Sequence, residues 1–152
     1  LSSFWSRNAQ KWRYYRKRWC ALMEFRLPLR VYIEDTDAGG IVYYVNYLKF
    51  MERARTEYMR AQGFSKTEIM NDALMFVVSA LQTKYLRPAR LDEQLIVTAR
   101  VIAAARVSLR FEQRVYRGEE LLCDADVTVA CVDSATLKPK RIPAPLLAAL
   151  KH

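Results

Sequence analysis

The fold is decided by the stretch NYLKFMERARTEY, residues 46–58. Apolar side chains recur in it at steps of three and four residues, which places them on one face of an α-helix; they are Tyr47, Phe50, Met51, Ala54 and Tyr58. Charged residues occupy the opposite face. Asn46 is a candidate N-cap and Gly63 a candidate C-terminal stop. The sequence therefore predicts one long amphipathic helix near its middle.

On both sides of this helix the apolar residues alternate with polar ones, which is the period of a β-strand. Residues 25–33 predict a first strand before the helix. Four further strands are predicted after it, over residues 76–85, 95–101, 107–115 and 121–131. A helix followed by a meander of antiparallel strands is an α+β arrangement. Each strand has one apolar face, so the sheet should pack that face on the helix and leave the other to water or a partner.

Length and composition indicate a globular chain. With 152 residues, 52% hydrophobic and 27% charged, it can bury the core of a single domain. No apolar stretch approaches the roughly 20 residues that cross a bilayer. The formal charge is +9, but six of the basic residues and only one acidic residue lie in the first 24 positions. The charge of the main body is ordinary, and with no nucleic-acid motif present we expect no nucleic-acid partner.

Residues 1–23 differ from the rest because they are rich in Trp, Tyr and Arg. Three interpretations stay open: a disordered extension, an amphipathic helix that contacts an anionic membrane surface, or a stretch translated ahead of a natural start at Met23. We expect residues 24–152 to form the single folded domain. The expected location is the cytoplasm, with the inner face of the membrane as a second location if the extension binds lipid.

Cysteine and histidine exclude several kinds of chemistry. Cys20, Cys123 and Cys131 form no CxxC pair. If the last two share a strand, they lie about 26 Å apart, too far for a disulfide, which favours a reducing compartment. The only histidine is His152. A Ser-His-Asp triad or a His-ligated zinc is therefore not expected within one chain, and we expect no metal and no cofactor.

The stretch EDTDAGGIVYY, residues 34–44, connects the first strand to the helix. Its three carboxylates repel one another, an arrangement that is costly for stability alone. Glycines after Asp37 let a substrate approach the backbone, and N–H groups at the helix start can stabilise an oxyanion. The carboxylate can attack a carbonyl or deprotonate a water that does. Taken alone, the pattern also fits an ordinary Asp-Gly turn.

The stretches VYIEDTDAGGIVY (31–43) and MERARTE (51–57) resemble the hotdog-fold acyl-CoA thioesterases of the 4-hydroxybenzoyl-CoA thioesterase family. Among them they are most similar to the bacterial subfamily associated with the Tol-Pal envelope system. The similarity continues through YLRPARLD (85–92), SLRF (108–111) and CVD (131–133), and covers about residues 25–145. It implies a hotdog fold, in which an antiparallel sheet wraps a long helix, and homodimers or homotetramers with active sites between protomers.

The resemblance also implies hydrolysis of an acyl-CoA or acyl-carrier-protein thioester without a cofactor. It assigns the catalytic carboxylate to Asp37 and the oxyanion donor to the backbone N–H of Tyr44. The residues between them would contact the substrate: Gly39, Gly40, Ile41, Val42 and Tyr43. Asp35 is expected to order the loop. Many members of the subfamily carry His at the position of Tyr44, so this chain must use the tyrosine or do without that side chain.

Two other functions stay open. A hotdog dehydratase or hydratase relies on an active-site His, and this chain has only His152. A non-catalytic module would bind acyl-CoA or dock at the envelope through the N-terminal extension. Several basic residues are candidates for contacts with CoA phosphates, although each also fits an ordinary surface: Arg87, Arg90, Arg106, Lys138, Lys140 and Arg141.

Overall fold

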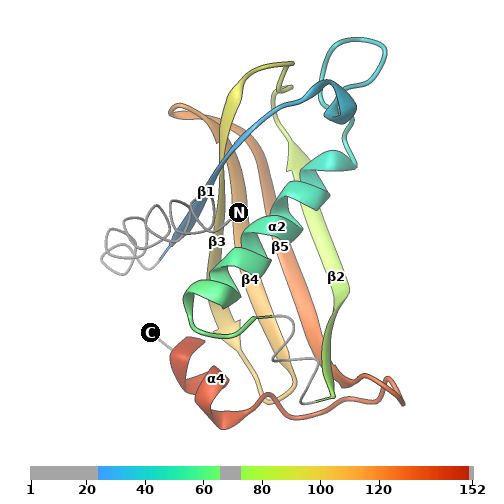
Figure 1. The fold of residues 1–152 in the computed structure, drawn as a ribbon, viewed down its shortest axis with the longest axis vertical. Helices are drawn as coiled ribbons and strands as arrows, with labels where there is room; N and C mark the ends of the chain where they lie inside the picture. Colours follow the sequence, from blue (N-terminus) through green and yellow to red (C-terminus); the bar gives the residue numbers. More distant parts are fainter. Residues whose placement is uncertain (1–23, 66–72, 151–152) are drawn as a thin grey trace, which may run out of the picture.

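The computed structural model describes residues 24–65 and 73–150, so the expectations for residues 1–23 fall outside it. Its elements follow the chain as β1 (Phe25–Arg30), a 3₁₀ turn η1 (Ile33–Asp35), α2 (Asn46–Ala61), β2 (Leu74–Tyr85), β3 (Gln94–Ala104), β4 (Ser108–Arg117), β5 (Glu120–Asp133) and α4 (Ala144–Leu150). The strands form a curved antiparallel sheet, and α2 crosses one face of it (Figure 1). The α+β prediction is confirmed.

The order of the strands differs from a simple meander. It is β1-β3-β4-β5-β2, so β3, β4 and β5 are sequential neighbours while β2 pairs with β5 at the edge. The prediction of a continuous meander is therefore wrong for β2. Alternation along a strand reports which face is buried but not which strand lies beside it. The connection after β2 crosses the end of the sheet, where the N–H groups of Leu86 and Arg87 donate to the Leu122 carbonyl.

The core lies between α2 and the inner face of the sheet. Phe50, Met51 and Ala54 on α2 are fully buried, as are the inward residues Leu95 and Val97 of β3. Burying a side chain as large as Phe or Leu contributes about 1.5–3 kcal/mol, so this face holds the helix in place. The helix packs mainly on β1, β3 and β4, and the part of the sheet formed by β5 and β2 has less helix over it.

The outer face of the sheet carries ion pairs across neighbouring strands. Arg100 of β3 pairs with Glu112 of β4, and Arg110 of β4 pairs with Asp126 of β5. The arginines are exposed and their acidic partners half-buried, and each such surface pair contributes at most about 1 kcal/mol. The outer face is therefore polar, as the alternation predicted.

The ends of α2 confirm one prediction and correct another. Gly63 has a φ of 94° and closes a Schellman motif, in which its N–H donates to Arg60 and the Phe64 N–H to Met59. Asn46 is not the N-cap, because the helix already includes it and Val45 precedes it. Its side-chain amide instead donates to the carbonyl oxygen of Asp35 at 2.8 Å.

Three further details differ from or extend the predictions. The first strand ends at Arg30 rather than Ile33, because residues 33–35 turn into a 3₁₀ helix. The C-terminal helix α4 was not predicted, since its seven residues are too few to show a helical period. Cys123 and Cys131 share β5, and both are buried free thiols.

Within the described residues, none of the helices is both long and apolar enough to cross a lipid bilayer.

Candidate active site

The loop between β1 and α2 is a short hairpin closed by backbone contacts. Thr36 forms an isolated antiparallel bridge with Val42. The Asp37 N–H donates to the Ile41 carbonyl at 2.9 Å, and the Gly40 N–H donates back to the Asp37 carbonyl at 3.1 Å. Gly40 has a φ of 77°, a conformation that glycine adopts without strain. The sequence Asp-Ala-Gly-Gly thus forms the tip of a tight turn.

The Asp37 carboxylate is exposed and only partly engaged. Its Oδ1 accepts a hydrogen bond from the Gly39 N–H at 2.8 Å, which fixes the direction of the side chain. No donor among the described residues bonds to its Oδ2. A Cβ added at Gly39 would lie 3.2 Å from Oδ1, so glycine leaves the carboxylate its present position. One oxygen is therefore held by the turn, and the other makes no hydrogen bond to a described residue.

Asp35 orders the loop, as predicted. It is 8% exposed, and its carboxylate accepts the Tyr32 N–H at 2.8 Å. Its carbonyl oxygen accepts both the Tyr43 N–H, at 3.0 Å, and the side-chain amide of Asn46. Asp35 therefore ties the strand side of the loop to the first turn of α2.

The N–H of Tyr44 lies just before α2 and points away from it. The carbonyl of Tyr43, in the same peptide group, accepts the Asn46 N–H at 2.8 Å and so points along the helix. In a trans peptide the N–H is directed opposite to the carbonyl. No acceptor among the described residues bonds to the Tyr44 N–H. The start of α2 therefore presents an open donor, which the helix dipole makes more positive.

Two other tyrosines contact Tyr44, and one of them, Tyr85, was not singled out from the sequence. The Tyr85 hydroxyl, at the end of β2, donates to the Tyr44 carbonyl at 3.0 Å. The Tyr44 ring, which is 58% exposed, contacts the rings of Tyr43 and Tyr85 edge to face. Burial raises the pKa of the Tyr85 hydroxyl, which keeps it protonated as a donor. The only sign of Tyr85 in the sequence was its place as the first residue of the stretch YLRPARLD.

The predicted substrate contacts occupy different environments. Gly39, Gly40 and Tyr43 are exposed, Ile41 is half-buried, and Val42 is 3% exposed. The Val42 side chain belongs to the core, and its N–H donates to the Ala89 carbonyl. The contact between Val42 and the substrate stays a prediction, because the Val42 side chain is buried within this chain.

The candidate phosphate contacts are divided between the two ends of the sheet. Arg90 lies beside the loop, in an isolated bridge with Ile41, and Arg87 pairs with Glu120 at 3.3 Å. The others, Arg106, Lys138, Lys140 and Arg141, lie around the end of β5 near α4. Within one chain the structure thus brings only Arg87 and Arg90 toward the loop.

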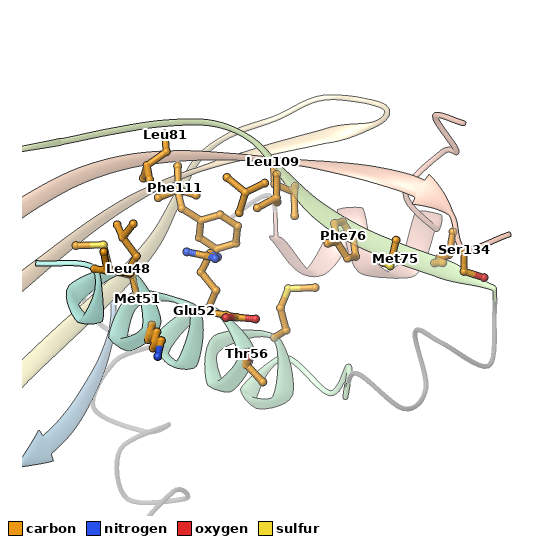
Figure 2. A pocket seen from close by; sticks show the side chains of 18 residues that line it. Leu48, Met51, Glu52, Thr56, Met75, Phe76, Leu81, Leu109, Phe111 and Ser134 are labelled. Atoms are coloured by element: carbon orange, nitrogen blue, oxygen red, sulfur yellow. The ribbon is translucent and has the colours of Figure 1, made fainter. Parts of the chain in front are cut away.

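A cavity of about 710 Å³ opens between α2 and the sheet. It begins at Val45, next to Tyr44, and extends along the helix to Met59. In Figure 2, Leu48 and Met51 project from the helix side and Leu81 and Phe111 from the sheet side. The cavity thus begins one residue after Tyr44, and its lining is largely apolar but includes the charged side chains of Lys49, Glu52 and Arg55.

A long helix wrapped by a five-stranded antiparallel sheet, with a carboxylate loop at the helix start, defines a hotdog-fold protein. The chain belongs to the thioesterase-like superfamily, whose family model matches residues 31–150.

Three relatives illustrate this membership. The chain is 44% identical over 129 residues to the acyl-CoA thioester hydrolase YbgC of Escherichia coli O6:H1, with 84% of this chain and 96% of that protein covered. It is also 44% identical to the acyl-CoA thioesterase YbgC of Haemophilus influenzae, covering 84% and 95%. A crystal structure of a probable thioesterase from Bartonella henselae superposes with a TM-score of 0.76 at 34% identity, covering 79% of this chain and 99% of that one.

Proposed function

We propose that this chain is a thioester hydrolase that converts acyl-CoA, or the acyl thioester of a carrier protein, to a free acid and a thiol. The observation that carries the proposal is an open carboxylate oxygen on Asp37 and an open N–H on Tyr44 in the same loop, followed by a largely apolar cavity that begins at Val45. The acyl-CoA thioesterases of E. coli and H. influenzae, at 44% identity, support the same reaction class.

The chemistry needs only groups that this chain supplies. The thioester oxygen accepts the Tyr44 N–H, which stabilises the negative charge that develops on it. Asp37 Oδ2 either attacks the carbonyl carbon, forming a mixed anhydride that water then hydrolyses, or removes a proton from a water that attacks directly. In both routes water is consumed, the C–S bond breaks and the thiol leaves with a proton. A single turnover in heavy-oxygen water identifies the first route when water attacks the anhydride at the Asp37 carboxyl carbon, since an Asp37 oxygen then enters the acid and a solvent oxygen enters Asp37.

The missing histidine is compatible with this scheme. The oxyanion donor is a main-chain group, and its direction is set by the Asn46 N–H that binds the Tyr43 carbonyl. The Tyr44 side chain contributes edge-to-face contacts with two tyrosines and no part of the donor itself. A different side chain at this position therefore leaves the reaction class unchanged.

The finer assignments are part of the same proposal. The motif at residues 31–43 supports membership of the Tol-Pal-associated subfamily of the 4-hydroxybenzoyl-CoA thioesterases. Two edge strands, β1 and β2, and exposed apolar residues such as Ile33 favour assembly into a homodimer or homotetramer. The buried free thiols Cys123 and Cys131 favour the cytoplasm.

Membrane contact through residues 1–23 is tested by co-sedimentation with anionic vesicles. If these residues bind lipid, a chain without residues 1–22 should no longer co-sediment.

The decisive experiment measures thiol release from a panel of acyl-CoAs by the intact chain and two variants. Asp37→Asn removes the reacting charge while keeping the Oδ1 contact with Gly39, and we expect it to fold normally and to lose at least a hundredfold in kcat. Glu34→Gln is the matched control, because it removes an exposed charge from the same loop, and it should retain turnover. Wild-type kcat in the Asp37→Asn protein contradicts the catalytic assignment.

The panel also separates hydrolysis from the non-catalytic alternative. The observation behind that alternative is Tyr44 itself, at the position where the subfamily that the motif resembles often carries His. If acyl-CoA binds to the wild-type chain, as measured by calorimetry, but no member of the panel releases thiol, the chain is a binding module rather than an enzyme.

A further inference from the structure

The carbonyl of Tyr44 is held by a side chain from the other end of the fold's edge strand. Within residues 24–65 and 73–150, the hydroxyl of Tyr85 is the only group that bonds to this oxygen, at 3.0 Å. The N–H of Leu48, four positions later, would be its partner in a regular α-helix. That N–H bonds to the Val45 carbonyl instead, at 3.0 Å. The Tyr44 carbonyl therefore lies outside the helical hydrogen-bond pattern and depends on β2.

Tyr44 lies between two peptide groups, and each of them is oriented by one hydrogen bond. The group before its Cα carries the open N–H, and the carbonyl of that group accepts the Asn46 N–H at 2.8 Å. The group after its Cα is held at the carbonyl by Tyr85, and its N–H, which belongs to Val45, bonds to no residue that the structure describes. Only φ and ψ of Tyr44 connect the two planar groups, so fixing both groups fixes the direction of the open N–H.

Tyr85 itself has a well-defined place. It is the last residue of β2 and pairs with Cys123 of β5. Its ring contacts the buried ring of Tyr47 edge to face, with centroids 5.6 Å apart, and the Tyr47 hydroxyl accepts the Ala89 N–H at 2.9 Å. Figure 1 shows this end of β2 beside the first turn of α2. The hydroxyl of Tyr85 thus links the paired end of the sheet to the start of the helix.

We propose that Tyr85 is a positioning residue for thioester hydrolysis: its hydroxyl holds the peptide groups of Tyr44 so that the Tyr44 N–H meets the thioester oxygen in the transition state. The inference rests on the proposed function and adds to it a side chain 41 positions away from the donor. Tyr85 makes and breaks no bond of the substrate. An oxyanion donor is most effective when its direction is fixed before charge develops on the oxygen.

The variant Tyr85→Phe tests the proposal, because it removes the hydroxyl and keeps the ring. We expect kcat to fall about tenfold, which is less than the hundredfold or more that loss of an oxyanion donor costs. KM should change less than about twofold, so that kcat and kcat/KM fall together, since the donor acts mainly on the transition state. Tyr85 is 43% exposed, and we expect the melting temperature to fall by no more than roughly 2–4 °C.

Two further variants complete the kinetic test. Tyr58→Phe is the matched control, since it removes a hydroxyl near the other end of α2, where the ring packs on Phe25 and Phe111; it should retain the wild-type kcat and KM. Tyr85→Met also lacks the hydroxyl and should show the same loss of kcat, so it replaces Tyr85→Phe if that protein does not fold.

Relaxation of the ¹⁵N nucleus of Tyr44 tests the hold on the donor without any substrate. In the wild-type chain we expect an order parameter of about 0.85, as in rigid backbone, and in Tyr85→Phe a value below about 0.6. The amides in the middle of α2 should not change. A general structural role of Tyr85 would lower the order parameters along the helix instead.

The outcomes separate this proposal from the proposed function. Wild-type kcat in folded Tyr85→Phe, or an unchanged order parameter at Tyr44, overturns the proposal and leaves hydrolysis standing. A raised KM with unchanged kcat also overturns it, because the hydroxyl would then bind the substrate directly. If the wild-type chain hydrolyses no acyl-CoA, the proposed function fails, whereas a loss of order at Tyr44 in Tyr85→Phe still supports the hold of Tyr85 on the donor.

Discussion

At the scale of single residues, the two glycines of the loop that carries Asp37 have different roles. Gly39 has no left-handed conformation to maintain, but an added Cβ would lie 3.2 Å from the Asp37 Oδ1. Gly40 has open space around its Cα but a φ of 77°. One glycine therefore protects the position of the carboxylate, whereas the other permits the turn.

Replacing each glycine by alanine should separate these tasks. Gly39→Ala must displace the carboxylate by a few tenths of an ångström, so we expect kcat to fall about tenfold with an almost unchanged melting temperature. Gly40→Ala places a Cβ in the left-handed region, which costs about 1–2 kcal/mol, so stability should fall more than activity. Steady-state kinetics and thermal unfolding measure both. Equal effects of the two variants on kcat would contradict the distinction.

At the scale of elements, α2 and the strands could be predicted because each buries one face. Apolar residues then recur in the sequence at the spacing of that buried face. Asn46 could not be placed correctly, because its amide bonds to Asp35, eleven positions earlier. The 3₁₀ turn at Ile33–Asp35 and helix α4 are shorter than any period that a pattern can reveal. The role of Tyr85 depends on a contact between the end of β2 and the start of α2, which local sequence does not record.

The packing of α2 also predicts an alkaline limit to stability. Tyr58 is 9% exposed and packs on Phe25 and Phe111, and burial raises its pKa from 10.0 to about 12. Below pH 10 its hydroxyl is neutral in both the folded and unfolded chains. Between about pH 10 and 12 the unfolded chain loses the proton first, so the free energy of unfolding should fall by roughly 2–3 kcal/mol.

Urea unfolding across this pH range, compared between wild type and Tyr58→Phe, checks the prediction. The variant has no hydroxyl to ionise, so its free energy of unfolding should decline less steeply above pH 10. Parallel curves for the two proteins would show that ionisation of Tyr58 does not contribute.

At the scale of the whole molecule, the composition and the alternation identified the α+β class, and the motif at residues 31–43 indicated both the hotdog fold and the loop. The sequence pattern did not reveal that β2 pairs with β5 at the sheet edge, and this placement forms one wall of the cavity. The loop could be found because its residues are contiguous. The cavity could not, because its walls come from four elements that only the tertiary fold brings together.

Assembly of copies of this chain predicts a further outcome. Ile33, 76% exposed beside the loop, is an apolar residue that a protomer boundary would bury. We expect light scattering to give a mass of two or four times 17.8 kDa for the wild-type chain, and Ile33→Asp to shift it toward that of one chain with loss of turnover. Ile102→Asp, on β3 and 40% exposed, is the control. A wild-type protein that is monomeric, or an Ile33→Asp protein of unchanged mass, contradicts the proposed assembly.

Anchoring at Asp35 has an evolutionary consequence. Its carbonyl accepts hydrogen bonds from the Tyr43 N–H and from the Asn46 side chain, so the loop is positioned by a small local framework. The cavity beside α2 has its opposite wall on β2, β4 and β5, away from this framework. Under the proposed function, mutations that change the preferred acyl group therefore need not disturb the loop. A library of variants randomised only in β2 should contain more variants with altered acyl preference than inactive variants.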